Sequence, residues 1–98
     1  MIEQNSDGQL RVSGPMLIGN ATALLAAGRG FLRTGAGEDV LVYDLSAVAE
    51  TDSSALAVIF GWLRTARARG VKIRITSLPA SMTSQAALYG VSDYLPLA

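Results

Sequence analysis

Four polar residues, Thr51, Asp52, Ser53 and Ser54, stand directly before an apolar run that begins at Ala55. An acid beside three hydroxyls could supply a nucleophile, a metal ligand, a helix cap or a phosphorylation site. A serine nucleophile needs a base, and the chain has no histidine and only one lysine, Lys72, which falls in a different predicted strand. Asp44 and Asp52, without further ligands, are too few for a convincing metal site. The cluster therefore does not predict an enzyme.

The same residues fit the start of a helix. Asp52 or Ser53 can cap the helix by accepting a hydrogen bond from a free backbone N–H, and one cap is enough. Thr51 and Ser54 then remain available, and a phosphoserine at a helix N-terminus is stabilised by the helix dipole. The residues by themselves allow two interpretations: a plain helix start, or a site for phosphorylation or partner contact.

The helix predicted over 53–69, which stops at Gly70, is apolar on more than one side. Its core face carries Leu56, Ile59, Phe60, Leu63 and Ala66. A second face carries Ala57, Val58, Gly61 and Trp62, where an isolated domain would place Lys and Glu. We expect this second face to bind a partner, with Val58 and Trp62 as anchors and Ala57 and Gly61 permitting close approach. The alternative is that another helix of the same domain covers it.

The remaining pattern alternates strands and helices. Strands are predicted over 8–14, 39–45 and 71–77, helices over 20–33 and 80–90, and a loop over 35–38. Gly28 and Gly30 weaken the first helix, which we expect to be broken or to fray late. This order predicts a single α/β domain spanning 1–98, with a mixed sheet and helices packed on it. The unbroken apolar run Val40–Tyr43 favours a central strand buried on both faces.

Composition narrows the function further. Eight basic and eight acidic residues give a formal net charge of zero, which does not favour electrostatic binding to nucleic acid or anionic lipid. The polar N-terminus does not resemble a signal peptide, and the longest apolar stretch, 55–63, is short for a membrane span. We therefore expect a cytoplasmic protein with no cofactor and no metal.

The segment from Leu41 to Gly70 resembles the centre of a STAS domain. In that family a buried strand ends in a D-L-S-like turn, here Asp44 to Ser46, and D-[ST]-[ST]-G-L opens a helix, here Asp52 to Leu56. "RVSG" near the start and "LYGVSDYLP" near the end also fit, so the resemblance covers nearly the whole chain. Ala55 replaces the motif glycine, and "SGPMLIGN" lacks the acidic G-E-L-D common in anti-sigma factor antagonists.

Within the family the sequence is most similar to the MlaB-type subunit of bacterial phospholipid-trafficking ABC transporters. The resemblance implies a non-catalytic cytoplasmic subunit, peripheral to the inner membrane, that binds and supports the transporter ATPase and so helps to maintain outer-membrane lipid asymmetry. It places Ser53 at that interface. The alternative it implies is an anti-sigma factor antagonist whose partners are an anti-sigma factor and a serine kinase that phosphorylates Ser53.

Overall fold

A four-stranded mixed sheet forms the base of the domain. The structure is a computed structural model that describes residues 1–5, 9–32 and 40–97. The strands lie in the order β1-β2-β3-β4, with β1 antiparallel to β2 and the other neighbours parallel. Their bounds are β1 Ile2–Gln4, β2 Leu10–Met16, β3 Leu41–Thr51 and β4 Ile73–Thr76. The predicted α/β class and mixed sheet are confirmed, and β3 is an interior strand as expected.

Three helices and two short 3₁₀ turns complete the described chain: η1 Ile18–Asn20, α1 Ala21–Arg29, α2 Ser53–Arg69, α3 Ala80–Leu88 and η2 Ser92–Tyr94. The bounds of α2 match the prediction, because both ends carry strong signals. Asp52 accepts a hydrogen bond from the backbone N–H of Ser54, and Gly70 ends the helix with a left-handed φ of 69°. Helix α1 ends at Arg29, before Gly30, in agreement with the expectation that Gly28 and Gly30 weaken the helix predicted over 20–33.

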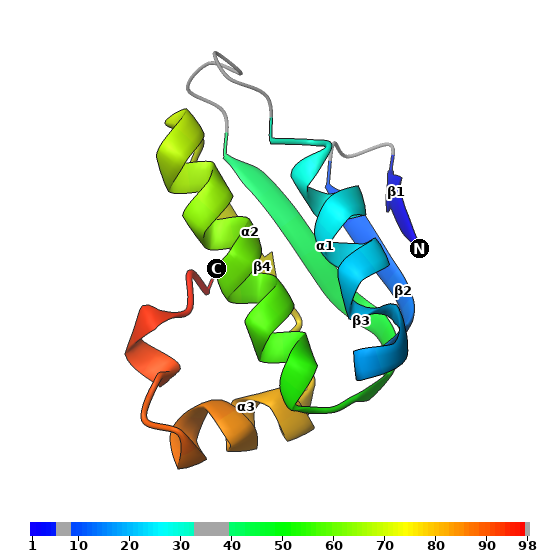
Figure 1. The fold of residues 1–98 in the computed structure, drawn as a ribbon, viewed down its shortest axis with the longest axis vertical. Helices are drawn as coiled ribbons and strands as arrows, with labels where there is room; N and C mark the ends of the chain where they lie inside the picture. Colours follow the sequence, from blue (N-terminus) through cyan, green and yellow to red (C-terminus); the bar gives the residue numbers. More distant parts are fainter. Residues whose placement is uncertain (6–8, 33–39, 98) are drawn as a thin grey trace.

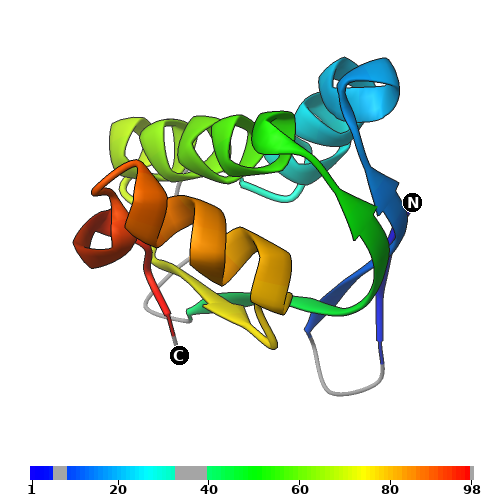
Figure 2. The ribbon, with the colours of Figure 1, turned by 90° about the horizontal axis from the view of Figure 1, so that it is seen from below.

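Helices α1 and α2 lie side by side on one face of the sheet, and α3 packs beside α2 (Figures 1 and 2). Alternation along the strands follows this layering: Leu10 and Val12 of β2 are buried and Arg11 is exposed, and β4 repeats the pattern around Arg74. No described helix covers the opposite face. The expectation that the central strand is buried on both faces is therefore wrong. Val42 and Asp44 are only half-buried, and Val40 lies outside the strand and is exposed.

The α1 seam, which we define as the contact of Leu25 and Gly28 on α1 with Gly61 and Trp62 on α2, holds the tightest packing. Trp62 is fully buried and donates from Nε1 to the carbonyl oxygens of Leu24 and Leu25, at 3.3 and 3.2 Å. Its ring stacks on Tyr43 of β3, with centroids 4.6 Å apart. A Cβ on Gly28 would stand 2.1 Å from Trp62 Nε1, so only glycine lets α1 approach this closely.

The two outer edges of the sheet are finished differently. Beyond β4, the backbone N–H of Ile75 donates to Pro96 O at 2.8 Å, and Leu97 forms an isolated parallel bridge with Ile75. The C-terminal segment thus covers the outer edge of β4. The other edge is β1, a strand of three residues.

Several boundaries differ from the predicted ones. Strand β1 was not predicted, the first predicted strand is displaced to β2, and β4 is shorter than 71–77. Strand β3 continues to Thr51, because its polar second half pairs in parallel with β2. The predicted loop over 35–38 lies outside the described residues.

Candidate functional site

The polar residues of the 51–54 cluster lie where the chain passes from β3 into α2. Thr51 is the last residue of β3 and is paired with Met16, the last residue of β2. The backbone N–H of Asp52 donates to Met16 O at 3.3 Å, and the helix begins at Ser53. We call this end of the molecule the tip, consisting of Thr51, Asp52, Ser53, Ser54, Ile18 and Ser81. It lies at the lower end of Figure 1, where α1, α2 and α3 also begin.

Asp52 is the organising residue of the tip. Its Oδ1 accepts hydrogen bonds from the backbone N–H of Ser54, at 2.9 Å, and from the Ser54 hydroxyl, and its Oδ2 accepts from the backbone N–H of Ile18 at 2.9 Å. The bond from the Ser54 hydroxyl, followed by that from Ile18, holds the pKa of Asp52 below its ordinary value of 3.8. One carboxylate therefore caps α2 and ties it to the turn that precedes α1.

The hydroxyls of the tip fall into two groups. Ser54 is bound to Asp52, and the Thr51 hydroxyl shares a hydrogen bond of 2.6 Å with Ser81 of α3. Ser53 is exposed, and its hydroxyl has no partner among the described residues. The structure therefore places Thr51, Asp52, Ser53 and Ser54 together, as predicted. Of their three hydroxyls, that of Ser53 alone has no hydrogen-bond partner in the described chain.

Two further residues of the tip were not predicted. Ile18 is 79% exposed even though its backbone is held by Asp52, and Ser81 reaches Thr51 from α3. Ile18 lies 34 residues before Asp52 in the chain, so no local spacing links the two. An apolar side chain standing in solvent beside Ser53 gives the tip an anchor for a partner surface.

The predicted partner face of α2 needs a correction. Val58 is 3% exposed and Trp62 is fully buried, and Gly61 is buried against Leu25, whose Cδ1 would lie 2.5 Å from an added Cβ. These three residues cannot anchor a partner on the folded domain, because they are buried inside it, Gly61 and Trp62 against α1 of the same chain. The alternative left open by the sequence is the correct one. Ala57 is exposed one turn from the tip and remains a candidate contact.

The chemistry available at the tip is that of recognition. The described residues contain no group of three or more His, Cys, Asp or Glu side chains able to hold a metal ion. Among the same residues, no helix is long and apolar enough to cross a bilayer. What the tip offers is a capped helix N-terminus, a row of hydroxyls and an exposed apolar residue, which suits contact with a protein surface.

Solved structures share this fold. A putative anti-sigma factor antagonist from Thermotoga maritima is 21% identical, with a TM-score of 0.71 over 99% of this chain and 83% of that one. A sulfate transporter family protein from Wolinella succinogenes is 14% identical, with a TM-score of 0.66 over 89% and 69%. The anti-sigma factor antagonist SpoIIAA, in its unphosphorylated form, is 14% identical, with a TM-score of 0.63 over 90% and 81%. At these identities the likeness concerns the fold.

Sequence comparison is more specific. No curated protein sequence matches the chain. A family model described as "Mlab, STAS domain" matches residues 2–97, which includes every strand and helix of the domain. The resemblance read from the segment Leu41 to Gly70 is confirmed at the level of the family, and the chain belongs to the Mlab-type STAS domains.

Proposed function

We propose that the chain is a non-catalytic subunit that uses the tip to bind and support the ATPase of a phospholipid-transporting ABC complex. The observation that carries the proposal is the exposed, unpartnered hydroxyl of Ser53 on a tip whose other polar groups are already bound to one another. A site fixed in this way changes little on binding, so the ordering cost of association is small. Membership of the Mlab-type family supports the transporter as the setting.

In this proposal the protein is cytoplasmic and reaches the inner membrane only through its partner. Its contribution is to hold the ATPase in an active arrangement, and the transporter moves phospholipids to maintain outer-membrane lipid asymmetry. The absence of histidine supports a role without catalysis, because a serine at the tip has no conventional base to activate it. Thr51, Ser53 and Ala57 are the proposed contact residues, with Asp52 and Ser54 holding them in position.

An anti-sigma factor antagonist is the second candidate, and one observation favours it. Ser53 is accessible to a kinase at a helix N-terminus, where a phosphate would be stabilised by the helix dipole. Two of the solved structures with this fold are described as anti-sigma factor antagonists. The partners in this case are an anti-sigma factor and a serine kinase.

Co-purification with the ATPase of a phospholipid-transporting ABC complex, co-expressed with this chain, tests the proposal. Ser53→Arg should reduce co-purification by about tenfold or more, since a large side chain at an interface centre prevents close contact. Ala27→Arg, an equal change at an exposed position of α1, is the matched control and should co-purify normally. Circular dichroism of both variants shows whether the domain remains folded.

Normal binding by Ser53→Arg would exclude the tip as the interface. Loss of fold in that variant would instead make Ser53 a structural residue. Two results would favour the antagonist. The first is phosphorylation of Ser53 by a candidate serine kinase and ATP, and the second is capture of an anti-sigma factor by the unphosphorylated form.

A further inference from the structure

A second surface lies toward the opposite end of α2 from the tip. A hollow of about 350 Å³ opens between α2 and the C-terminal turn η2, and we call it the basic groove: Phe60, Leu63, Arg64, Arg67, Val91 and Tyr94. Leu63 is ten residues beyond Ser53, which corresponds to about 15 Å along a helix. The groove is therefore separate from the tip, and an inference about it does not depend on the function proposed above.

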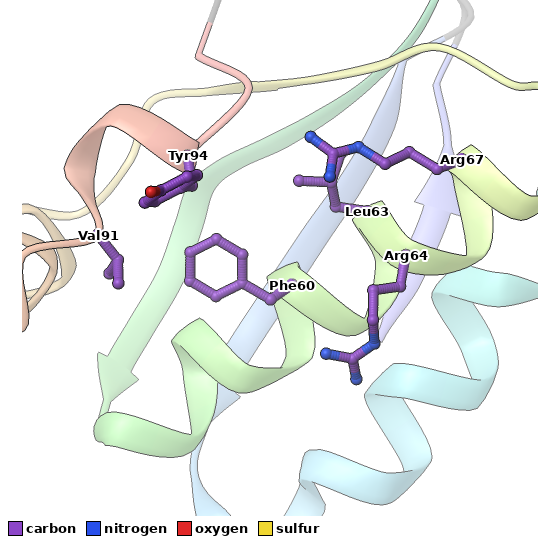
Figure 3. Close-up of a pocket in the computed structure, with 6 residues that line it drawn as sticks. All are labelled: Phe60, Leu63, Arg64, Arg67, Val91 and Tyr94. Carbon is purple, nitrogen blue, oxygen red and sulfur yellow. The ribbon is translucent and has the colours of Figure 1, made fainter.

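The floor of the basic groove is apolar. Phe60 and Leu63 project from α2, and Val91 and Tyr94 meet them from the C-terminal segment (Figure 3). Phe60, Leu63 and Val91 are half-buried and Tyr94 is 65% exposed. Apolar surface is left in solvent here, although α1 seals the other flank of the same helix. The groove is too open to enclose a small molecule, which usually buries most of its surface in a pocket.

The rim of the groove is positively charged. Arg64 and Arg67 line it directly, and an adjoining hollow that shares Leu63, Arg67 and Tyr94 adds Lys72 and Arg74. Arg64, Arg67 and Lys72 make no hydrogen bond or ion pair with any described residue, and Arg74 reaches only the carbonyl oxygen of Ile73 at 3.4 Å. Among the residues that the structure describes, Asp93 is the single acid lining either hollow. These cations are available to an external anion.

The sequence concentrates positive charge around this groove. Residues 53–92 include Arg64, Arg67, Arg69, Lys72 and Arg74 and no aspartate or glutamate. Arg69 is already engaged, because its Nη1 donates to Leu32 O at 2.6 Å on the α1 side. A chain with a net charge of zero thus places Arg64 and Arg67 at the basic groove and Lys72 and Arg74 at the adjoining hollow, none of them paired with an acid of the described chain. This arrangement is complementary to an acidic ligand with apolar anchors.

We propose that the basic groove binds an acidic amphipathic helix of a partner protein. The apolar side chains of such a helix, repeated at i, i+4 and i+7, would enter the groove between α2 and η2. Its flanking aspartates or glutamates would face Arg64 and Arg67 at the groove, and Lys72 and Arg74 where the helix continues over the adjoining hollow. The concave shape favours a helix over an anionic membrane, because a flat bilayer surface cannot reach a floor recessed between two elements of the chain.

The test is selection from a displayed library of helical peptides with fixed leucines at i, i+4 and i+7. The flanking positions are randomised among Glu, Lys and Gln, and the purified domain is the target. Glutamate should be enriched over lysine in the bound pool. A selected peptide should then bind about tenfold more weakly to Arg64→Gln/Arg67→Gln and to Tyr94→Ser, because these variants remove the charged rim and an apolar wall respectively.

Charge-matched controls keep the result specific. Thr22→Glu/Ala26→Glu changes the net charge by the same amount on the exposed side of α1 and should leave binding unchanged. A peptide with its glutamates replaced by lysines should recover binding to Arg64→Glu/Arg67→Glu. Melting curves establish that each variant is folded, and Tyr94→Ser tests the groove independently of charge.

Three outcomes would overturn the proposal. The first is a bound pool with no enrichment of acidic residues, and the second is unchanged binding by the Arg64→Gln/Arg67→Gln and Tyr94→Ser variants. The third is sedimentation of the domain with phosphatidylglycerol vesicles that depends on Arg64 and Arg67, without selection of acidic peptides. That third result would make the membrane the occupant of this surface.

Discussion

The two flanks of α2 differ in what covers them. On one flank Gly61 and Trp62 meet α1 at the α1 seam, with Trp62 fully buried. On the other flank Phe60 and Leu63 are left half-buried beside Arg64 and Arg67, whose charges have no partner in the described chain. Small residues mark the flank that is closed inside the domain, while long cationic ones mark the flank that stays open. A small-residue face on a helix therefore indicates close approach of another backbone, and it does not say whether that backbone belongs to a partner.

Trp62→Ala should give the largest effect and tests the sealed flank directly. It removes a fully buried ring, its stacking on Tyr43 and its hydrogen bonds to α1. Substitutions of this kind cost about 3–5 kcal/mol, which is a large part of the stability of a small domain. Urea denaturation followed by circular dichroism measures the change. A loss below about 1 kcal/mol would mean that the α1 seam is not the core of the domain.

Gly28→Ala and Gly61→Ala form a matched pair on the same seam. The added methyl at 28 meets Nε1 and Cε2 of Trp62, at 2.1 and 2.2 Å, and this ring is held in place by Tyr43. We expect a loss of about 1–3 kcal/mol from overpacking. At 61 the nearest atom is the terminal Cδ1 of Leu25, which can rotate away, and alanine gains about 1 kcal/mol of helix propensity. Gly61→Ala should therefore be close to neutral in the same denaturation assay.

Equal destabilisation by the two alanines would show that Leu25 is as fixed as Trp62. The opposite order, with Gly61→Ala the more harmful, would contradict the geometry of the seam.

Asp52→Asn should have a smaller effect that depends on pH. The hydrogen bonds to Asp52 lower its pKa in the folded state, so its carboxylate stabilises the fold above the ordinary aspartate value of 3.8, and this contribution is lost as the pH falls through the lowered folded-state pKa. The variant should melt below the wild type at neutral pH, and the gap should close in acid. Melting temperatures of both proteins across that range provide the measurement. A gap that does not change with pH would assign the effect to geometry alone.

Tyr94→Ser should have the smallest effect on stability, within about 0.5 kcal/mol, because the ring is 65% exposed on the open flank. Comparison with Trp62→Ala in the same assay sharpens the contrast between the two flanks. A loss as large as that of a core residue would mean that η2 and α2 depend on this ring for their packing.

Much of the fold follows from local signals in the sequence. Asp52 and Gly70 define both ends of α2, and the alternation at Ile73 and Ile75 locates β4. Strand β1 could not be predicted, because three residues with one apolar side chain show no recognisable alternation. The second half of β3 could not be predicted either, because the mostly polar and small residues from Ser46 to Thr51 resemble a loop. They form a strand only through their pairing with β2.

The tip could be predicted in part, for a related reason. Thr51 to Ser54 are adjacent in the chain, so their grouping at a helix start is a local matter. The contacts of Asp52 with Ile18 and of Thr51 with Ser81 span 34 and 30 residues and depend on the tertiary fold. The burial of Trp62 depends in the same way on how closely α1 approaches α2. Gly28 permits this close approach, but the presence of a glycine in the sequence does not predict it.

The strand-like contact of Pro96 and Leu97 with β4 has a consequence for how the protein behaves in solution. Exposed strand edges are templates for aggregation, and here the N–H of Ile75 is already occupied by Pro96 while the opposite edge is only three residues long. The outer edge of β4 is therefore not free to pair with a second chain. Shortening the chain before Pro96 would bare the β4 edge, and the resulting insolubility could easily be mistaken for the loss of a partner.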